Sequence, residues 1–300
     1  MDFVVRVDHL PAPGETVLGA GFQMIPGGKG ANQACAAGKL ASDAVRARMV
    51  GRVGYDVFAD HLKASLAAAG VDVTYVHAVR SQPTGVALIW VDASGQNSIV
   101  VASGANHALL ASEIEGMRPA FRDAAFALFQ LETPLDAVAA ALAMAREEGA
   151  RTILDPAPAQ PLPRALLERV DILTPNEGEA RLLLGVPARP TSLEEAREMA
   201  ACLRAKGPAA VILKLGEQGC FYADGEREVH APAFAVTAMD TTAAGDTFNA
   251  GLAVALAEGQ DIGRALVFAN AAAAISVTRL GAQVSQPTRA EVEAFLAARA

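Results

Sequence analysis

Short apolar runs alternate with longer helical stretches from about residue 120 to the C-terminus. The apolar runs lack the period-two alternation of half-exposed strands, and we expect buried strands at residues 124–131, 152–155, 172–174 and 210–215. The stretches between them predict helices at residues 134–149, 177–185 and 193–207. Buried strands separated by helices indicate an α/β protein whose mostly parallel sheet is covered on both faces.

Two stretches outside this pattern, residues 3–24 and 84–101, are rich in Val, Thr and Ile. The second alternates well enough to predict a hairpin of strands at 85–91 and 97–101. We expect antiparallel strands that form a small lid, and an extra hairpin at the edge of the main sheet is the alternative. The predicted division is a core and a lid: residues 25–83 and 103–300, and residues 1–24 and 84–102.

Ligands of open parallel sheets bind at the carboxyl ends of the strands. We therefore expect the chemistry just after Leu131, Asp155, Thr174 and Leu215.

The segment Asp240-Thr-Thr-Ala-Ala-Gly-Asp246 combines a turn of small residues with the predicted start of a helix at Asp246, which continues to Glu258. Unpaired amides and the dipole make such a helix N-terminus a binding site for anions. Asp246 could take a proton from a hydroxyl while the neighbouring amides stabilise a transferring phosphoryl group. The alternative is an ordinary N-cap aspartate.

The segment Pro26-Gly-Gly-Lys-Gly-Ala-Asn-Gln33 enters a predicted helix near Ala31. Its paired glycines allow a close approach to a polyhydroxy ligand, and Asn32 offers both a donor and an acceptor. The spacing differs from that of a Walker P-loop. A simple glycine turn before a helix is the alternative.

The composition narrows the class of protein. The formal net charge of 25 − 33 = −8 gives no basic footprint for nucleic acid. Three cysteines without a CxxC pair argue against a disulfide scaffold or a cysteine zinc site, and the five histidines show no metal-ligand spacing. Polar residues interrupt every apolar run well before the roughly 20 residues that span a bilayer, and no signal peptide is evident, so we expect a cytoplasmic enzyme without a membrane partner.

Several runs, in one order along nearly the whole chain, resemble the PfkB-type carbohydrate kinase family. They are Pro13-Gly-Glu-Thr16, Gly27-Gly-Lys-Gly-Ala-Asn32, Gln130-Leu-Glu132, Asp155-Pro-Ala157, Thr174-Pro-Asn-Glu177, Leu215-Gly-Glu-Gln-Gly219 and the segment from Asp240 to Asp246. The run from Gly28 to Asn32 is similar to the ribokinase branch of the family in particular.

The resemblance implies a ribokinase-like three-layer α/β/α fold with a small β-sheet lid. It implies ATP-dependent phosphorylation of D-ribose at O5, with Mg²⁺, with K⁺ as a monovalent activator, and with a homodimer formed through the lids. Asp246 matches the catalytic base, and Ala243, Ala244 and Gly245 match the anion hole.

The remaining site residues are also implied by the resemblance. The sugar-binding positions are Asp2, Gly28, Lys29, Gly30, Asn32 and Glu132. The nucleotide positions are Asn176, Glu179, Lys214, Leu215, Gly216, Glu217, Gln218, Gly219, Gly245 and Asn270, with Glu179 helping to organise Mg²⁺-bound phosphates. The positions near the monovalent cation are Asp240, Thr242, Ser276, Arg279, Gly281 and Ser285.

Other interpretations stay open at this point. Glu132 could be a solvated loop acid, and Lys214 could only cap a strand. Glu179 could pair with Arg181 or a neighbour and have no further role. The substrate could be deoxyribose, fructose or a nucleoside, or the protein could bind sugar without catalysis. A nicotinamide dehydrogenase is disfavoured, because no G-x-G-x-x-G follows a strand.

Members of the family have a strand and a Gly-Ser-Ile-Asn-like turn before the segment that Met1-Asp2 matches. We expect that Met1 is an internal methionine and that translation starts upstream. A chain without that buried strand is expected to be poorly stable and to bind sugar weakly.

Overall fold

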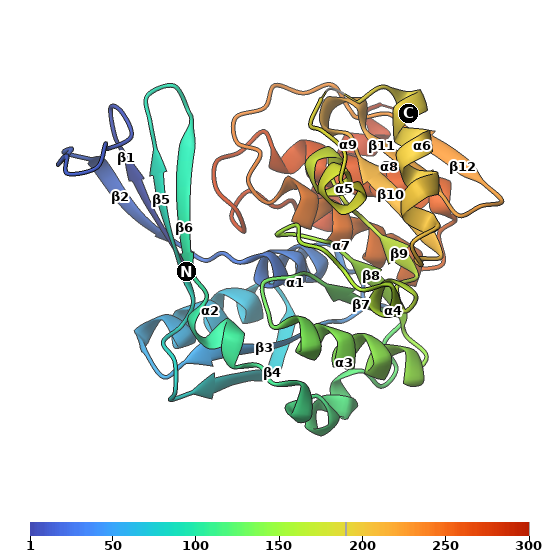
Figure 1. Cartoon of the computed structure of the whole chain (residues 1–300), viewed down its shortest axis with the longest axis horizontal. Helices are drawn as coiled ribbons and strands as arrows, with labels where there is room; N and C mark the ends of the chain where they lie inside the picture. Colours follow the sequence, from blue (N-terminus) through green and yellow to red (C-terminus); the bar gives the residue numbers. More distant parts are fainter. Residues whose placement is uncertain (190, 300) are drawn as a thin grey trace.

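The computed structural model describes residues 1–189 and 191–299. The main body has three layers, with a sheet between two layers of helices, and a separate small sheet projects from it (Figure 1). This arrangement confirms the expected α/β/α class with a lid-like sheet.

The central sheet has six strands in the order β12-β11-β10-β9-β8-β7. They are β7 (Phe126–Phe129), β8 (Arg151–Leu154), β9 (Ile172–Leu173), β10 (Ala210–Lys214), β11 (Cys220–Ala223) and β12 (Glu228–Ala231). Strands β7 to β10 are parallel, whereas β11 and β12 are antiparallel to their neighbours. The sheet is therefore mostly parallel, and all four strands predicted from the apolar runs are present.

Successive residues of the central strands face two different cores. Ile153, Ile172 and Ile212 pack into one cluster, whereas their neighbours Leu154, Leu173 and Leu213 pack into the other. The helices of the first cluster are α1 (Lys29–Leu40), α7 (Ala244–Ala257), α8 (Ile262–Ser276) and α9 (Arg289–Ala297). Those of the second are α3 (Leu135–Glu147), α4 (Arg164–Leu167), α5 (Glu177–Leu184) and α6 (Leu193–Arg204). Burial on both faces explains why the strand sequences show no alternation.

Strands β3 (Ala47–Gly54) and β4 (Val71–Val79) pair in parallel, with α2 (Val57–Ala68) between them in the chain. Within residues 1–189 and 191–299 they form a sheet of their own, so the strand layer is two sheets instead of one. Four 3₁₀ turns complete the assigned elements: η1 (Gly104–Ala108), η2 (Ala111–Glu113), η3 (Glu115–Ala120) and η4 (Gly216–Gln218).

The projecting sheet has the order β2-β1-β5-β6. Its strands are β1 (Asp2–Arg6), β2 (Ala20–Ile25), β5 (Val86–Val91) and β6 (Asn97–Ala102). The hairpin β5-β6 pairs with β1 and with no strand of the main sheet, so the edge-hairpin alternative is wrong. The expectation of purely antiparallel pairing is also wrong, because β1 and β5 run parallel. Between β1 and β5 the chain forms β2 and then passes through the core elements α1, β3, α2 and β4. This connection is long enough for a parallel crossover.

Asp56 and Thr84 fix the point where the chain leaves the core for β5. The Asp56 carboxylate caps α2 by accepting from the amides of Phe58 and Ala59, and it also accepts from the amide and hydroxyl of Thr84, each at 2.7 Å. At the base of the same sheet, the α-amino group of Met1 donates to the Gly85 carbonyl at 2.9 Å. The division into a lid of residues 1–24 and 84–102 and a core of residues 25–83 and 103–300 stays a prediction.

In the described ranges, 1–189 and 191–299, no helix has the length and apolar character needed to cross a membrane.

Truncation of Leu213 to alanine tests the two-sided core. Leu213 is fully buried on β10, so Leu213→Ala should lower the free energy of unfolding by about 2–5 kcal/mol through lost burial and a residual cavity. The control Leu18→Ala removes the same atoms from a side chain that is 89% exposed and should change stability by less than about 0.5 kcal/mol. Urea denaturation measures both values, and equal losses would contradict the assigned core.

Candidate active site

A cavity of about 440 Å³ opens at the carboxyl ends of the central strands. Asp155 follows β8, Asn176 follows β9, and Lys214 ends β10, so three neighbouring strands each contribute a polar side chain. The full lining consists of Lys29, Asp155, Ala157, Asn176, Glu177, Gly178, Glu179, Lys214, Gly216, Thr241, Ala243, Ala244, Gly245 and Asp246. The polar groups meet where the parallel-sheet rule predicts a ligand site.

Asp246 lies in the first turn of α7 and is 5% exposed. Its two carboxylate oxygens accept hydrogen bonds, each of 3.0 Å, from the side-chain amides of Asn32 and Gln33. Burial and the nearby Asp155 raise the pKa of Asp246 to about 6, while Lys29 and the two amides oppose the shift. The N-cap of α7 is Ala243, so the interpretation of Asp246 as an ordinary cap is wrong.

The turn before α7 presents main-chain amides to the cavity. Ala243 adopts φ 59°, a left-handed conformation that is costly for a residue with a Cβ. α7 therefore begins at Ala244, two residues before the expected start. The Ala244 amide donates to the Thr241 carbonyl at 3.2 Å, whereas the amides of Gly245 and Asp246 lie in the first turn, where the helix supplies no acceptor. These two amides and the helix dipole favour an anion at this point.

Two lysines compensate the negative charge of the cavity. The Lys214 ammonium pairs with the buried Asp155 carboxylate at 2.9 Å, so Lys214 does more than cap a strand. Gly245 leaves room for it, because a Cβ there would lie 3.2 Å from the Lys214 nitrogen. Burial opposes the charge of Lys29, but Asp246, Asp155 and further acids raise its pKa overall. Both lysines line the cavity together with the α7 turn.

Glu179 and Asn176 form a reciprocal capping box at the start of α5. Glu179 accepts from the main-chain and side-chain amides of Asn176 at 2.8 and 2.9 Å, and Asn176 accepts from the Glu179 amide. Arg181 pairs with Glu195, so Glu179 does not pair with Arg181. Its partner is the neighbouring Asn176, which the alternative of a purely structural pairing also allowed. Burial raises the pKa of Glu179, and Lys214 opposes that shift.

The expected sugar-binding residues gather around the N-terminus of α1. Glu132 accepts from the Lys29 amide at 2.8 Å and is half-buried, so it is not a solvated loop acid. Asp2 of β1 lies so close to Gly27 that a Cβ at position 27 would overlap its carboxylate. Burial raises the pKa of Asp2, and the negative charge of Glu132 adds to the rise. Gly28 has φ 96°, and Asn32 donates to Asp246, so this group of residues adjoins Asp246.

Residues 215–219 follow β10 as a tight turn in which the Leu215 amide donates to the Gly219 carbonyl at 2.8 Å. Lys214 and Gly216 line the cavity, whereas Glu217 and Gln218 are exposed and Leu215 is buried. Asn270 is buried on α8 and donates to the carbonyls of Ala231 and Pro232. Its amide thus supports the end of β12, and Asn270 is not among the residues that line the cavity.

Asp240 ties together the two loops expected to hold a monovalent cation. Its carboxylate accepts from the Thr242 amide at 2.9 Å and from the Gly281 amide at 2.8 Å. The hydroxyls of Ser276 and Ser285 are buried and donate to carbonyls three residues earlier. Arg279 pairs with Glu291 at 2.6 Å and so belongs to the support of the loop.

Three polar residues of the site had no role in the sequence-based assignment: Gln33, Gln130 and Asp155. Asp155 could have been found, since it is the last residue of the buried strand predicted at residues 152–155. Gln33 and Gln130 lie in motifs that were recognised, but only the fold shows that the Gln130 amide donates to the Gln33 side-chain oxygen.

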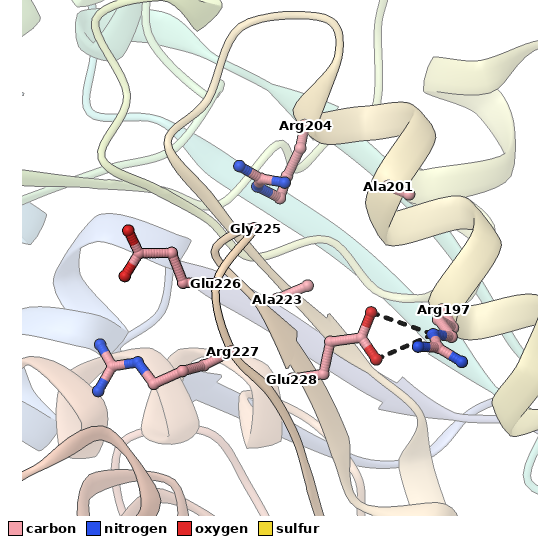
Figure 2. A pocket seen from close by; sticks show the side chains of 8 residues that line it. All are labelled: Arg197, Ala201, Arg204, Ala223, Gly225, Glu226, Arg227 and Glu228. Atoms are coloured by element: carbon pink, nitrogen blue, oxygen red, sulfur yellow. Dashed lines mark hydrogen bonds and ion pairs between the residues drawn. The ribbon is translucent and has the colours of Figure 1, made fainter.

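A second cavity, of about 310 Å³, lies between α6 and the β11-β12 turn (Figure 2). Arg197 makes two contacts with the Glu228 carboxylate there, at 3.0 and 2.9 Å, while Arg227 pairs with Asp224. None of the expected site residues lines this cavity.

The fold, with a buried carboxylate beside unpaired main-chain amides, indicates a phosphotransferase of the carbohydrate kinase type. Residues 1–289 match the pfkB family carbohydrate kinase domain, and the chain belongs to this family.

The chain is 41% identical over 295 residues to a ribokinase of Haemophilus influenzae and 42% identical over 296 residues to one of Bacillus subtilis. These matches cover 98% and 99% of this chain and 95% and 96% of the relatives. A solved ribokinase of Arabidopsis thaliana, complexed with ribose and ATP, superposes with a TM-score of 0.91 at 34% identity, over 98% of this chain and 95% of that one.

Removal of the Lys214 ammonium tests the buried ion pair. Lys214→Met should lower the free energy of unfolding at pH 7 by about 3–5 kcal/mol, because it leaves the Asp155 carboxylate buried without its partner. Arg164→Met breaks the exposed pair with Glu168 and should cost less than about 0.5 kcal/mol. Chemical denaturation measures both, and a loss for Lys214→Met as small as that of the control would contradict a buried pair.

Proposed function

We propose that the protein phosphorylates D-ribose at O5 with ATP and releases D-ribose 5-phosphate and ADP. The observation that carries the proposal is the buried Asp246 carboxylate, which adjoins both the amides of the α7 turn and the group of Asp2, Asn32 and Glu132. Family membership and the full-length similarity to ribokinases support the reaction class and the sugar.

In the proposed reaction Asp246 accepts the proton of the 5-hydroxyl of ribose while the oxygen of that hydroxyl attacks the γ-phosphorus of ATP. The new O–P bond forms while the bond from the γ-phosphorus to the bridging oxygen breaks, and ADP leaves with that oxygen. The amides of Gly245 and Asp246 and the ammonium groups of Lys29 and Lys214 stabilise the charge on the transferring group. Asp246 then returns its proton to solvent.

The sugar site is proposed to comprise Asp2, Gly28, Lys29, Gly30, Asn32 and Glu132. Carboxylates accept hydrogen bonds from hydroxyls, and Asn32 both donates and accepts, which suits a neutral polyol. The glycines keep the main chain close to the ligand. A sugar acid would instead call for an arginine.

The nucleotide site is proposed to comprise Asn176, Glu179, residues 214–219, Gly245 and Asn270. Lining of the cavity by Asn176, Glu179, Lys214, Gly216 and Gly245 supports this assignment. Asn270 would act through the main chain at Ala231 and Pro232, to which it donates.

Mg²⁺ fits the donor set of the cavity. Mg²⁺ is usually held by one or two carboxylates together with substrate phosphates and water, and the residues that the structure describes contain no group of three or more His, Cys, Asp or Glu side chains that could hold a metal alone. We propose that Glu179 helps to hold the phosphate-bound ion, which would neutralise the charge of the phosphates.

We propose that K⁺ binds at the two loops that Asp240 joins. One contains Thr242, and the other, which follows Ser276 at the end of α8, contains Arg279, Gly281 and Ser285. They offer main-chain oxygens, the ligand type that hard cations take, and the Asp240 carboxylate already holds them together. We propose that the cation, when bound, stabilises the loop that leads into Ala243 and the amides after it.

The lid is proposed to close over the sugar and exclude water, which competes as a phosphoryl acceptor.

Asp2 reaches the core from one face of the projecting sheet. Strand register places Phe3, Met24, Leu88 and Val100 together on the opposite face, where Met24, Leu88 and Val100 are exposed. Such a patch marks an interaction surface, and we propose a homodimer through it. Use of ATP leads us to propose a cytoplasmic location.

The assignment of Asp246 is tested with Asp246→Asn in an assay of ADP release with ribose, Mg²⁺ and K⁺. We expect turnover to fall about 10²–10⁴-fold, with ribose affinity kept within several-fold. In the unaltered protein, turnover should decline as the pH falls through about 6, because protonation removes the base. Unchanged turnover in the variant would refute the role of Asp246.

Parallel assays with deoxyribose, fructose and a nucleoside test the choice of sugar. In the same assay with ribose, omission of K⁺ should lower turnover.

The proposed dimer is tested by light scattering of the purified chain. The unaltered protein should have twice the mass of one chain, and Val100→Lys should give a single-chain mass, because it places a charge in the apolar face. Val186→Lys alters an exposed apolar residue beyond α5 and should leave the dimer intact. A single-chain mass for the unaltered protein would overturn the proposal.

A further inference from the structure

Gln33 lies between the two buried acids of the cavity. It is 2% exposed on α1, and its side-chain nitrogen is 3.0 Å from an oxygen of Asp246 and 3.2 Å from an oxygen of Asp155. A glutamine NH₂ group has two hydrogens, so one amide can donate to both carboxylates at once. Gln33 is therefore a neutral bridge between two like charges.

Gln130 determines which end of the Gln33 amide faces the acids. Its side-chain nitrogen donates to the Gln33 oxygen, so the Gln33 nitrogen must point toward Asp246 and Asp155. Gln130 directly follows β7 and is thus anchored on the central sheet. Gly30 makes room for it, because a Cβ at position 30 would lie 3.0 Å from the Gln130 oxygen.

The bridge has consequences for a base that must be ionised. Asp155 raises the pKa of Asp246, and the hydrogen bond from Gln33 lowers it. The other charged groups near Asp246 are Lys29 of α1 and Lys214 and Glu179, which surround Asp155. A substitution at Gln33 leaves all of these charges in place, so it isolates the contribution of the bridge.

We propose that Gln33, oriented by Gln130, is a positioning residue that holds the Asp246 carboxylate ionised and aimed at the substrate hydroxyl. The assignment of the hydroxyl rests on the proposed kinase function, whereas the effect of Gln33 on Asp246 does not. Gln33 itself need not touch the sugar, since both hydrogens of its amide are directed at acids. Its loss should therefore affect turnover more than sugar affinity.

The kinetic test uses Gln33→Met, which keeps the length of the side chain and removes the amide. We expect kcat at pH 7 to fall about 10–100-fold, the loss that is typical when a residue that orients a metal ligand is replaced. The KM for ribose should change less than about three-fold. The acid limb of the kcat profile should move to higher pH, because the ionised base loses a donor. Gln130→Met should shift it in the same direction by less. A profile that superposes on that of the unaltered protein, or a rise in KM alone, would overturn the proposal.

Thr152→Val controls for a general loss of stability. Thr152 is also fully buried and hydrogen-bonded, but to Arg169 and Asp171 away from the cavity. We expect this variant to be less stable and to keep the pH profile of the unaltered protein. A matching shift in Thr152→Val would contradict a specific role for Gln33.

A second readout does not need activity. With ¹³C-labelled aspartate, the Asp246 carboxyl signal, identified by its absence in Asp246→Asn, should titrate near pH 6 and at higher pH in Gln33→Met and Gln130→Met. An unchanged midpoint in both variants would overturn the role of Gln33 even if the unaltered protein phosphorylates ribose. If that protein phosphorylates no sugar while the midpoint moves, the proposed function fails and the effect of Gln33 on Asp246 stands.

Discussion

The site depends on one carboxylate that is kept out of water at the start of a helix. Asp246 is almost fully buried, and an ionised group in such a place must be compensated by hydrogen bonds or charge. Neutral amides of Asn32 and Gln33 contact it directly, while lysines act from a greater distance. A direct ion pair would lower the pKa of this carboxylate more than the two amides do, and would make it a weaker base. The arrangement keeps Asp246 basic at neutral pH.

The rest of the core brings the partners of this carboxylate into range. Asn32 and Gln33 come from α1, Asp155 follows β8, and Lys214 ends β10. Parallel strands buried between two helical layers deliver their carboxyl ends to one edge of the sheet, so segments far apart in sequence meet there. The left-handed Ala243 then turns the chain so that α7 begins with its amides at the same edge.

The projecting sheet contributes one acid near the N-terminus of α1. Asp2 of β1 lies against Gly27, beside Glu132 of the core. The parallel pairing of β1 with β5 joins two excursions of the chain from the core into one sheet. One face presents Asp2 to the core, and the opposite face carries the exposed side chains of Met24, Leu88 and Val100.

The pattern of hydrophobic and polar residues along the chain predicted individual strands and helices, because a buried strand or an amphipathic helix is encoded in consecutive residues. The parallel strands, the β5-β6 hairpin and the motif ending in Asp246 were all predictable in this way. The sequence could not give the parallel partner of β1, the separation of β3-β4 from the main sheet, or the bridge from Gln130 through Gln33 to two acids. Those features join residues as far apart as 33 and 246, and which distant side chains meet is decided only when the strands have their order and the helices their packing.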